Sequence, residues 1–215
     1  MTLPSFMLLL PANRTLNLKI KTRDNETIGA WFVLSDPYYH SLPSIPTNVA
    51  AHVIPALKEY PVILFFHGNA VTRAAPCRIP VYQGFSSRLG TNVLVIDYRG
   101  FADSTGQPSE HGLLSDARSA FDWLVAHGKR AEDILIVGHS LGTGVAGMLG
   151  AELSSERINP RGIVFLSVGR NIIPVRSLAD GNLAIHKHSR GTTSLQPIWL
   201  HSPDEASFCD SGGYP

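Results

Sequence analysis

Alternating apolar and polar positions near the start of the chain predict an antiparallel hairpin. Leu16, Leu18 and Ile20 alternate with polar residues, which is the period of a half-buried strand. A polar break follows, and residues 28–34 then form a second strand-like run. Two such runs joined by a short polar segment are typical of a hairpin. Residues 35–55 contain several prolines and few charges, so we expect a loop there.

The middle of the chain has a different pattern, in which continuous apolar runs alternate with helix-like stretches. Strands that are buried on both faces of a parallel sheet have such runs. The runs lie at residues 61–66, 92–96, 134–137 and 162–166, and the helix-like stretches lie at 80–89, 109–127 and 141–153. This order predicts an α/β fold, with a mostly parallel sheet and helices on both faces.

The periodic pattern ends near residue 167. Residues 171–215 are rich in Ser, Gly, Pro and His, and they show neither a long alternation nor a long helical face. We therefore expect a folded core at 14–167 and an irregular or disordered tail at 168–215. A segment with few periodic apolar residues buries too little surface to offset its own ordering entropy.

Composition narrows the classes of function. The 215 residues are 44% hydrophobic and carry 18 basic and 17 acidic side chains, so the chain is long enough for one globular core. Its net charge of +1 gives no basic surplus for nucleic acid. The nine histidines are scattered, and the only cysteines, Cys77 and Cys209, lie far apart, which leaves a disulfide between them open. We expect no metal and no cofactor.

The chain also carries weak signals about its compartment. The longest apolar run near the start, residues 6–11, is far shorter than the roughly 20 residues that a bilayer span needs. It lacks the basic flank and the small-residue cleavage site of a signal peptide. Two sequons, at Asn13 and Asn25, slightly favour a secretory lumen.

The strongest chemical signal is the segment Gly138-His139-Ser140-Leu141-Gly142. It follows one apolar run and precedes a helical stretch, which is the context of a nucleophile elbow. The serine of an elbow lies on a sharp, strained turn, and the flanking glycines allow the strand and the helix to approach closely. The alternative is a small-residue turn that only packs a helix on a sheet. We favour Ser140 as a catalytic nucleophile.

Two further segments follow predicted strands. His67-Gly68-Asn69-Ala70 comes directly after the run at 61–66, where a loop commonly supplies an oxyanion-hole donor. We expect the backbone N–H groups of Asn69 and Leu141 to form that hole, and the side chain of His67 to hold the loop by hydrogen bonds.

The other segment, at 97–104, reads Asp-Tyr-Arg-Gly-Phe-Ala-Asp-Ser. We favour a structural role for Asp97 and Arg99 there, as hydrogen-bonding anchors of a strand-end loop, over a direct role in substrate binding.

Together the three segments resemble the α/β-hydrolase superfamily, and most of all its monoacylglycerol and lysophospholipid lipase branch, the abhydrolase-12-like proteins. The entry hairpin resembles that branch as well, while Ala102 stands where the family usually has a second glycine. The resemblance implies the α/β-hydrolase fold and a serine esterase or lipase that cleaves carboxylic esters, with lipid esters favoured, through an acyl-enzyme. It also implies association with the endoplasmic reticulum, and it leaves peripheral membrane contact and the oligomeric state open.

The remaining members of a catalytic triad do not stand out in the sequence. The resemblance places the acid and then the histidine after Ser140. The candidate acids are Asp180, Asp204, Glu205 and Asp210, and the candidate bases are His186, His188 and His201. No histidine follows Asp204, the acid candidate with the most family-like surroundings. The sequence therefore predicts either a serine hydrolase or a catalytically incomplete remnant, such as a splice form or frame-shifted product, that binds a ligand or partner without turnover.

Overall fold

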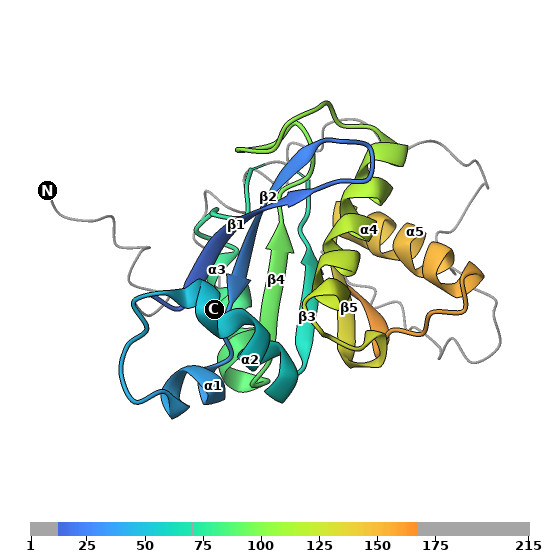
Figure 1. The fold of residues 1–215 in the computed structure, drawn as a ribbon. Helices are drawn as coiled ribbons and strands as arrows, with labels where there is room; N and C mark the ends of the chain where they lie inside the picture. The colour runs from blue at the N-terminus through green and yellow to red at the C-terminus, as the bar shows by residue number, and fades with distance from the viewer. Residues whose placement is uncertain (1–12, 70, 167–215) are drawn as a thin grey trace, which may run out of the picture.

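One six-stranded sheet organises the computed structural model, which describes residues 13–69 and 71–166 (Figure 1). The strands lie in the order β1-β2-β4-β3-β5-β6. Strands β3 to β6 are parallel, and β1 and β2 form an antiparallel hairpin that joins the sheet through β4. The strands are β1 Thr15–Lys21, β2 Thr27–Val33, β3 Val62–Phe66, β4 Asn92–Ile96, β5 Ile134–His139 and β6 Gly162–Leu166. The predicted fold class and entry hairpin are confirmed, and the predicted tail lies outside the described residues.

The expectation of a loop at 35–55 is wrong, because short helices occupy much of that segment. They are α1 at Asp36–Ser41, a 3₁₀ turn η2 at Val49–His52 and the start of α2 at Val53–Glu59. Two of the four prolines in this segment, Pro37 and Pro55, lie in the first turns of α1 and α2, while Pro43 and Pro46 lie in the irregular stretch between α1 and η2. A first-turn proline removes no intrahelical hydrogen bond, and its fixed φ suits a helix.

The longer helices follow the predicted pattern. Helix α4 spans Glu110–Ala126 and is capped by the preceding Ser109, whose side chain accepts a hydrogen bond from the backbone N–H of Gly112. Helix α5 spans Leu141–Ser155. The stretch predicted at 80–89 is divided into α3, Ile79–Gln83, and a π-helical turn, η3, at Gly84–Arg88. A short 3₁₀ turn, η4, at Ala131–Asp133 leads into β5.

Alternate side chains of the central strands pack into two separate hydrophobic clusters. Leu64 and Phe66 of β3 pack in the cluster that includes α4 and α5, which lie side by side in Figure 1. Phe65 points to the opposite face and packs with Ile79 and Tyr82 of α3. Burial of each large apolar side chain contributes roughly 1.5–3 kcal/mol, so burial on both faces explains why β3 is a continuous apolar run.

The parallel strands bring three loops to one edge of the sheet. The loops after β3, β4 and β5 begin at His67, Asp97 and Ser140, and the three strands run in the same direction. Ligands of open α/β sheets bind outside the carboxyl ends of the strands. The sequence segments with chemical signals therefore gather where such a fold places its site.

Candidate active site

Ser140 lies in a sharp turn between β5 and α5. Its backbone has φ 51° and ψ −115°, which is a strained conformation for any residue with a side chain. Hydrogen bonds on both sides hold the turn. The N–H of Ser140 donates to the carbonyl of Leu166 at 3.0 Å, and Thr143 donates to the Ser140 carbonyl through its N–H at 2.9 Å and its hydroxyl at 2.6 Å. The strand, turn and helix of a nucleophile elbow are therefore present.

The two glycines that flank the elbow allow close backbone contacts. A Cβ added at Gly142 would lie 2.0 Å from the carbonyl oxygen of Phe66, and one added at Gly138 would lie 2.2 Å from the carbonyl oxygen of Gly142. This is the close approach that we predicted for the flanking glycines. It also places the first turn of α5 directly against the end of β3, so the elbow and the His67 loop are neighbours.

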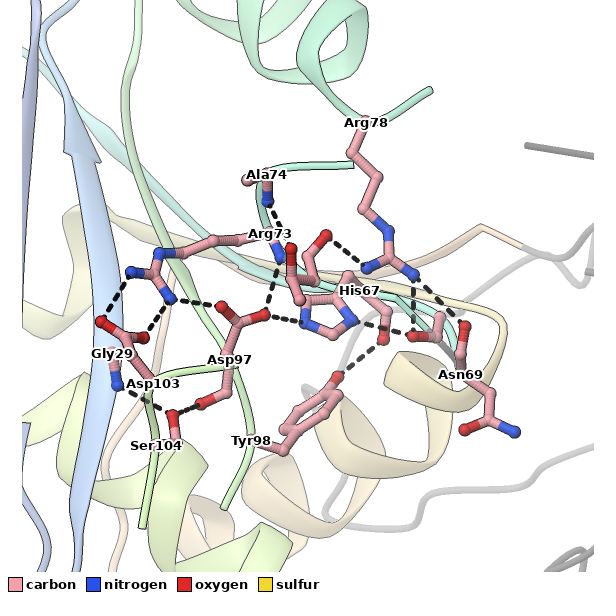
Figure 2. Close-up of polar contacts among 12 residues, drawn as sticks. Gly29, His67, Asn69, Arg73, Ala74, Arg78, Asp97, Tyr98, Asp103 and Ser104 are labelled. Atoms are coloured by element: carbon pink, nitrogen blue, oxygen red, sulfur yellow. Dashed lines mark hydrogen bonds and ion pairs between the residues drawn. The ribbon is translucent and has the colours of Figure 1, made fainter. Parts of the chain in front are cut away.

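His67 anchors the loop after β3, as predicted. Its side chain is buried, with Nε2 3.1 Å from Oδ1 of Asp97 and Nδ1 2.8 Å from the carbonyl oxygen of Gly68 (Figure 2). The hydroxyl of Tyr98 donates to the His67 carbonyl at 2.7 Å. Burial is the largest influence on the pKa of His67 and lowers it, in opposition to Asp97. Burial thus favours the neutral ring, and its two contacts hold the loop.

Asp97 is the centre of a buried polar network. Its carboxylate accepts hydrogen bonds from the backbone N–H of Arg73, at 2.6 Å, and from the Arg73 guanidinium. That guanidinium also donates to Asp103 at 2.8 Å (Figure 2). Its other terminal nitrogen donates to Asn17 of β1, also at 2.8 Å. Burial alone would raise the pKa of Asp97, but the hydrogen bonds and charges of His67 and Arg73 bring it below its ordinary value. The network ties the loop after β3 to the loop after β4 and to β1.

Arg99 fixes the loop after β4 from its other side. Its backbone N–H and guanidinium donate to the buried Asp116 at 2.8 to 3.0 Å, and the guanidinium also pairs with Asp24. Asp97 and Arg99 therefore have the structural role that we favoured. In the same loop Gly100 has φ 77° and Ala102 has φ 49°. Ala102, which stands where the family usually has a second glycine, therefore has a left-handed backbone conformation. An alanine in that conformation costs roughly 1–2 kcal/mol.

Neither of the two arginines that hold the loop after β3, Arg73 and Arg78, was found from the sequence. Arg78 donates to the backbone carbonyls of Thr72 at 2.8 Å, Gly68 at 3.1 Å and Asn69 at 3.3 Å. It follows His67 by eleven residues through an irregular loop, so no periodic pattern or motif spacing connects the two.

All candidates for the acid and the base of a triad lie outside the described residues. They are Asp180, Asp204, Glu205, Asp210, His186, His188 and His201. Within the described ranges, no three His, Cys, Asp or Glu side chains are grouped so as to hold a metal ion. The same part of the chain contains no helix with the length and apolar character to cross a bilayer.

Comparison with known proteins places the chain in a family. Residues 63–212 match the model of the alpha/beta hydrolase family, which is more than half of the chain. The chain belongs to the α/β-hydrolase family. The matched range continues past residue 167 into the segment whose structure is not described.

The chain is similar to curated proteins of the predicted branch. It is 38% identical over 168 residues to the lysophosphatidylserine lipase ABHD12 of Rattus norvegicus, which covers 74% of this chain and 39% of that protein. It is 36% identical over 138 residues to the Homo sapiens protein ABHD12B, and this match covers 61% of this chain and 35% of that protein. The resemblance to the monoacylglycerol and lysophospholipid lipase branch is confirmed. The chain spans about two fifths of the length of these relatives.

Solved structures agree on the fold. The esterase Pf2001 of Pyrococcus furiosus superposes with a TM-score of 0.51 at 19% identity, covering 76% of this chain and 54% of that one. An alpha-beta hydrolase of Vibrio vulnificus superposes with a TM-score of 0.52 at 23% identity, covering 70% and 44%. At this level of identity the likeness concerns the fold alone.

Proposed function

We propose that this chain carries the nucleophile and oxyanion-hole half of a serine hydrolase that cleaves carboxylic esters. The observation that carries the proposal is the turn at Ser140, with φ 51° and ψ −115° between β5 and α5. A strained serine at the head of a helix, at the carboxyl edge of a parallel sheet, is the arrangement that presents a nucleophile. The hydrolase lineage of the chain supports the same assignment.

In the proposed mechanism Ser140 Oγ attacks the ester carbonyl carbon, and a base takes the hydroxyl proton. The carbonyl oxygen becomes an oxyanion and accepts hydrogen bonds from the N–H groups of Asn69 and Leu141, while the N-terminal end of α5 favours the negative charge. The tetrahedral intermediate collapses, the alcohol leaves with the proton, and an acyl-enzyme remains. Water then attacks the acyl carbon and releases the acid. No cofactor enters these steps.

Lipid esters are the proposed substrate class. The support is the name of the relatives, lysophosphatidylserine lipase, at 38% identity over the part of the chain that matches. A lipid substrate also suggests that the protein works beside a membrane. The resemblance of its sequence motifs to the abhydrolase-12-like branch leads us to propose peripheral contact with the endoplasmic reticulum. Fold alone does not define a substrate, so this assignment depends on the relatives rather than on the sheet.

The second candidate function is binding without turnover. It stays a candidate because the described residues, 13–69 and 71–166, do not include the candidate acids and bases of a triad. A serine without a base keeps its proton at neutral pH and is a poor nucleophile. This alternative predicts a folded domain in which Ser140 shows no enhanced reactivity.

Labelling of the purified chain with a fluorophosphonate separates the two functions. The hydrolase proposal predicts a covalent adduct on the peptide that contains Ser140, located by mass spectrometry, and loss of the adduct in Ser140→Ala. Ser155→Ala is the matched control, because Ser155 is an exposed serine at the other end of α5 and should leave labelling unchanged. Absence of an adduct at Ser140 in the unaltered chain would contradict the hydrolase proposal and support binding without turnover.

A further inference from the structure

One peptide group in the loop after β3 is held by its carbonyl oxygen. The oxygen of Gly68 accepts a hydrogen bond from Nη2 of Arg78 at 3.1 Å and lies 2.8 Å from Nδ1 of His67 (Figure 2). A trans peptide is planar, so its C=O and the N–H of the following residue point in opposite directions. Contacts that draw the Gly68 carbonyl toward Arg78 therefore turn the N–H of Asn69 away from Arg78.

His67 donates to this carbonyl in only one of its two neutral tautomers. Its two ring nitrogens face two acceptors, the Gly68 carbonyl and the Asp97 carboxylate, and a neutral imidazole has only one N–H to donate. A proton on Nε2 serves Asp97 and leaves the Gly68 oxygen without the His67 bond. The guanidinium of Arg78 is always charged, and its N–H groups are donors in every state of His67.

The position of Arg78 is itself rigid. It immediately precedes α3, its carbonyl accepts hydrogen bonds from Val81 and Tyr82, and the residue is 8% exposed. From there the guanidinium also reaches the carbonyls of Thr72 and Asn69. A planar group with five donors can satisfy several carbonyls at once, whereas a lysine offers a single nitrogen.

We infer that Arg78 is a positioning residue for the oxyanion hole, because it fixes the Gly68–Asn69 peptide so that the Asn69 N–H faces away from α3 and is available to the oxyanion. The inference rests on the proposed function for its catalytic consequence. Its structural content, the orientation and order of one amide, stands on the hydrogen bonds of Arg78.

Amide NMR of the ¹⁵N-labelled chain tests the structural content. In Arg78→Met we expect the order parameter of the Asn69 amide to fall from about 0.85, the value of a rigid backbone, to below about 0.6. Arg78→Lys should give an intermediate value, which keeps the test valid if the methionine variant folds poorly. Arg88→Met changes an exposed arginine of η3 and should leave the Asn69 amide unchanged. An Asn69 amide that stays rigid in both Arg78 variants would overturn the inference.

The rate of fluorophosphonate labelling tests the catalytic consequence, since phosphonylation also places negative charge on an oxygen in the hole. Loss of one oxyanion donor typically lowers a rate about 10²–10³-fold, so we expect labelling about 10²-fold slower in Arg78→Met and wild-type labelling in Arg88→Met. Equal rates in Arg78→Met and the unaltered chain would refute the positioning role. A chain that is not labelled at all contradicts the proposed function, and the amide measurement then decides the role of Arg78 alone.

Discussion

A single methyl group at position 142 should disrupt the contact between the elbow helix and the central strand. The Cβ of Gly142→Ala would lie 2.0 Å from the carbonyl oxygen of Phe66 and 3.0 Å from that of His67. Ordinary van der Waals contact begins near 3.4 Å, so the helix and the strand must separate by about 1.4 Å. Phe66 ends β3, which is paired on both sides, by β4 and β5. The first turn of α5 is therefore the part that must move.

The size of the effect follows from this geometry. Overpacking by one or two carbons in a well-packed region costs about 1–3 kcal/mol, and more when the neighbour cannot move. The neighbour here is backbone of a central strand, so we expect the free energy of unfolding to fall by about 3 kcal/mol. For a domain of this size that is a decrease of roughly 6–12 °C in Tm. Misplacement of a catalytic group by about 1 Å also lowers rates about 10²-fold, so labelling of Ser140 should slow.

Urea denaturation of matched variants measures the change. Gly144→Ala is the control, because it makes the same substitution in the same helix, where the added Cβ meets nothing within 4 Å. Alanine is favoured over glycine in a helix by roughly 0.5–1 kcal/mol, so Gly144→Ala should be slightly more stable than the unaltered chain. Equal stabilities of Gly142→Ala and Gly144→Ala would show that the close approach has no energetic weight, and would refute the reasoning.

The strain at Ser140 and the acid response of Asp24 give two more predictions. Ser140→Gly should be about 1 kcal/mol more stable than Ser140→Ala. Glycine relieves a backbone strain of about 1–3 kcal/mol, and its larger loss of conformational entropy on folding offsets part of that gain. Equal thermal unfolding of the two variants would contradict this prediction. The Arg99 hydrogen bond lowers the pKa of Asp24 far below its ordinary range, so its stabilisation is present above the unfolded pKa of about 3.9 and is lost as the pH falls below it. Urea midpoints at pH 7 and pH 3 should therefore differ less in Asp24→Asn than in the unaltered chain, and an equal difference would count against this role.

Strands β3 and β4 could be predicted because both of their faces are buried. Val62–Phe66 and Asn92–Ile96 contain only buried residues, so the apolar run and the strand nearly coincide in each. The helices at 36–59 could not be predicted, since Pro37 and Pro55 are breakers in most sequence contexts. Their position within the first turn, which makes them compatible with a helix, depends on where the chain leaves β2.

The candidate site also has one part that the sequence predicts and one that it does not. The turn at Ser140 could be predicted because only glycine fits at 138 and 142, and that requirement leaves a fixed spacing in the sequence. The contacts of Arg78 could not, because they end on backbone carbonyls. Every residue has a backbone carbonyl, so the acceptors of such a bond are set by the path of the loop. No particular residue type in the sequence marks them.

The order of the strands has a consequence for synthesis of the chain on the ribosome. β3 lies between β4 and β5, and Val62 pairs with Ile134, which is made more than seventy residues later. The hairpin of β1 and β2 can close locally, whereas β3 emerges as an unpaired, wholly apolar segment and waits for both neighbours. Pairing between distant segments is slow and leaves such strands open to aggregation. The nascent chain is thus most in need of a chaperone between the emergence of β3 and that of β5.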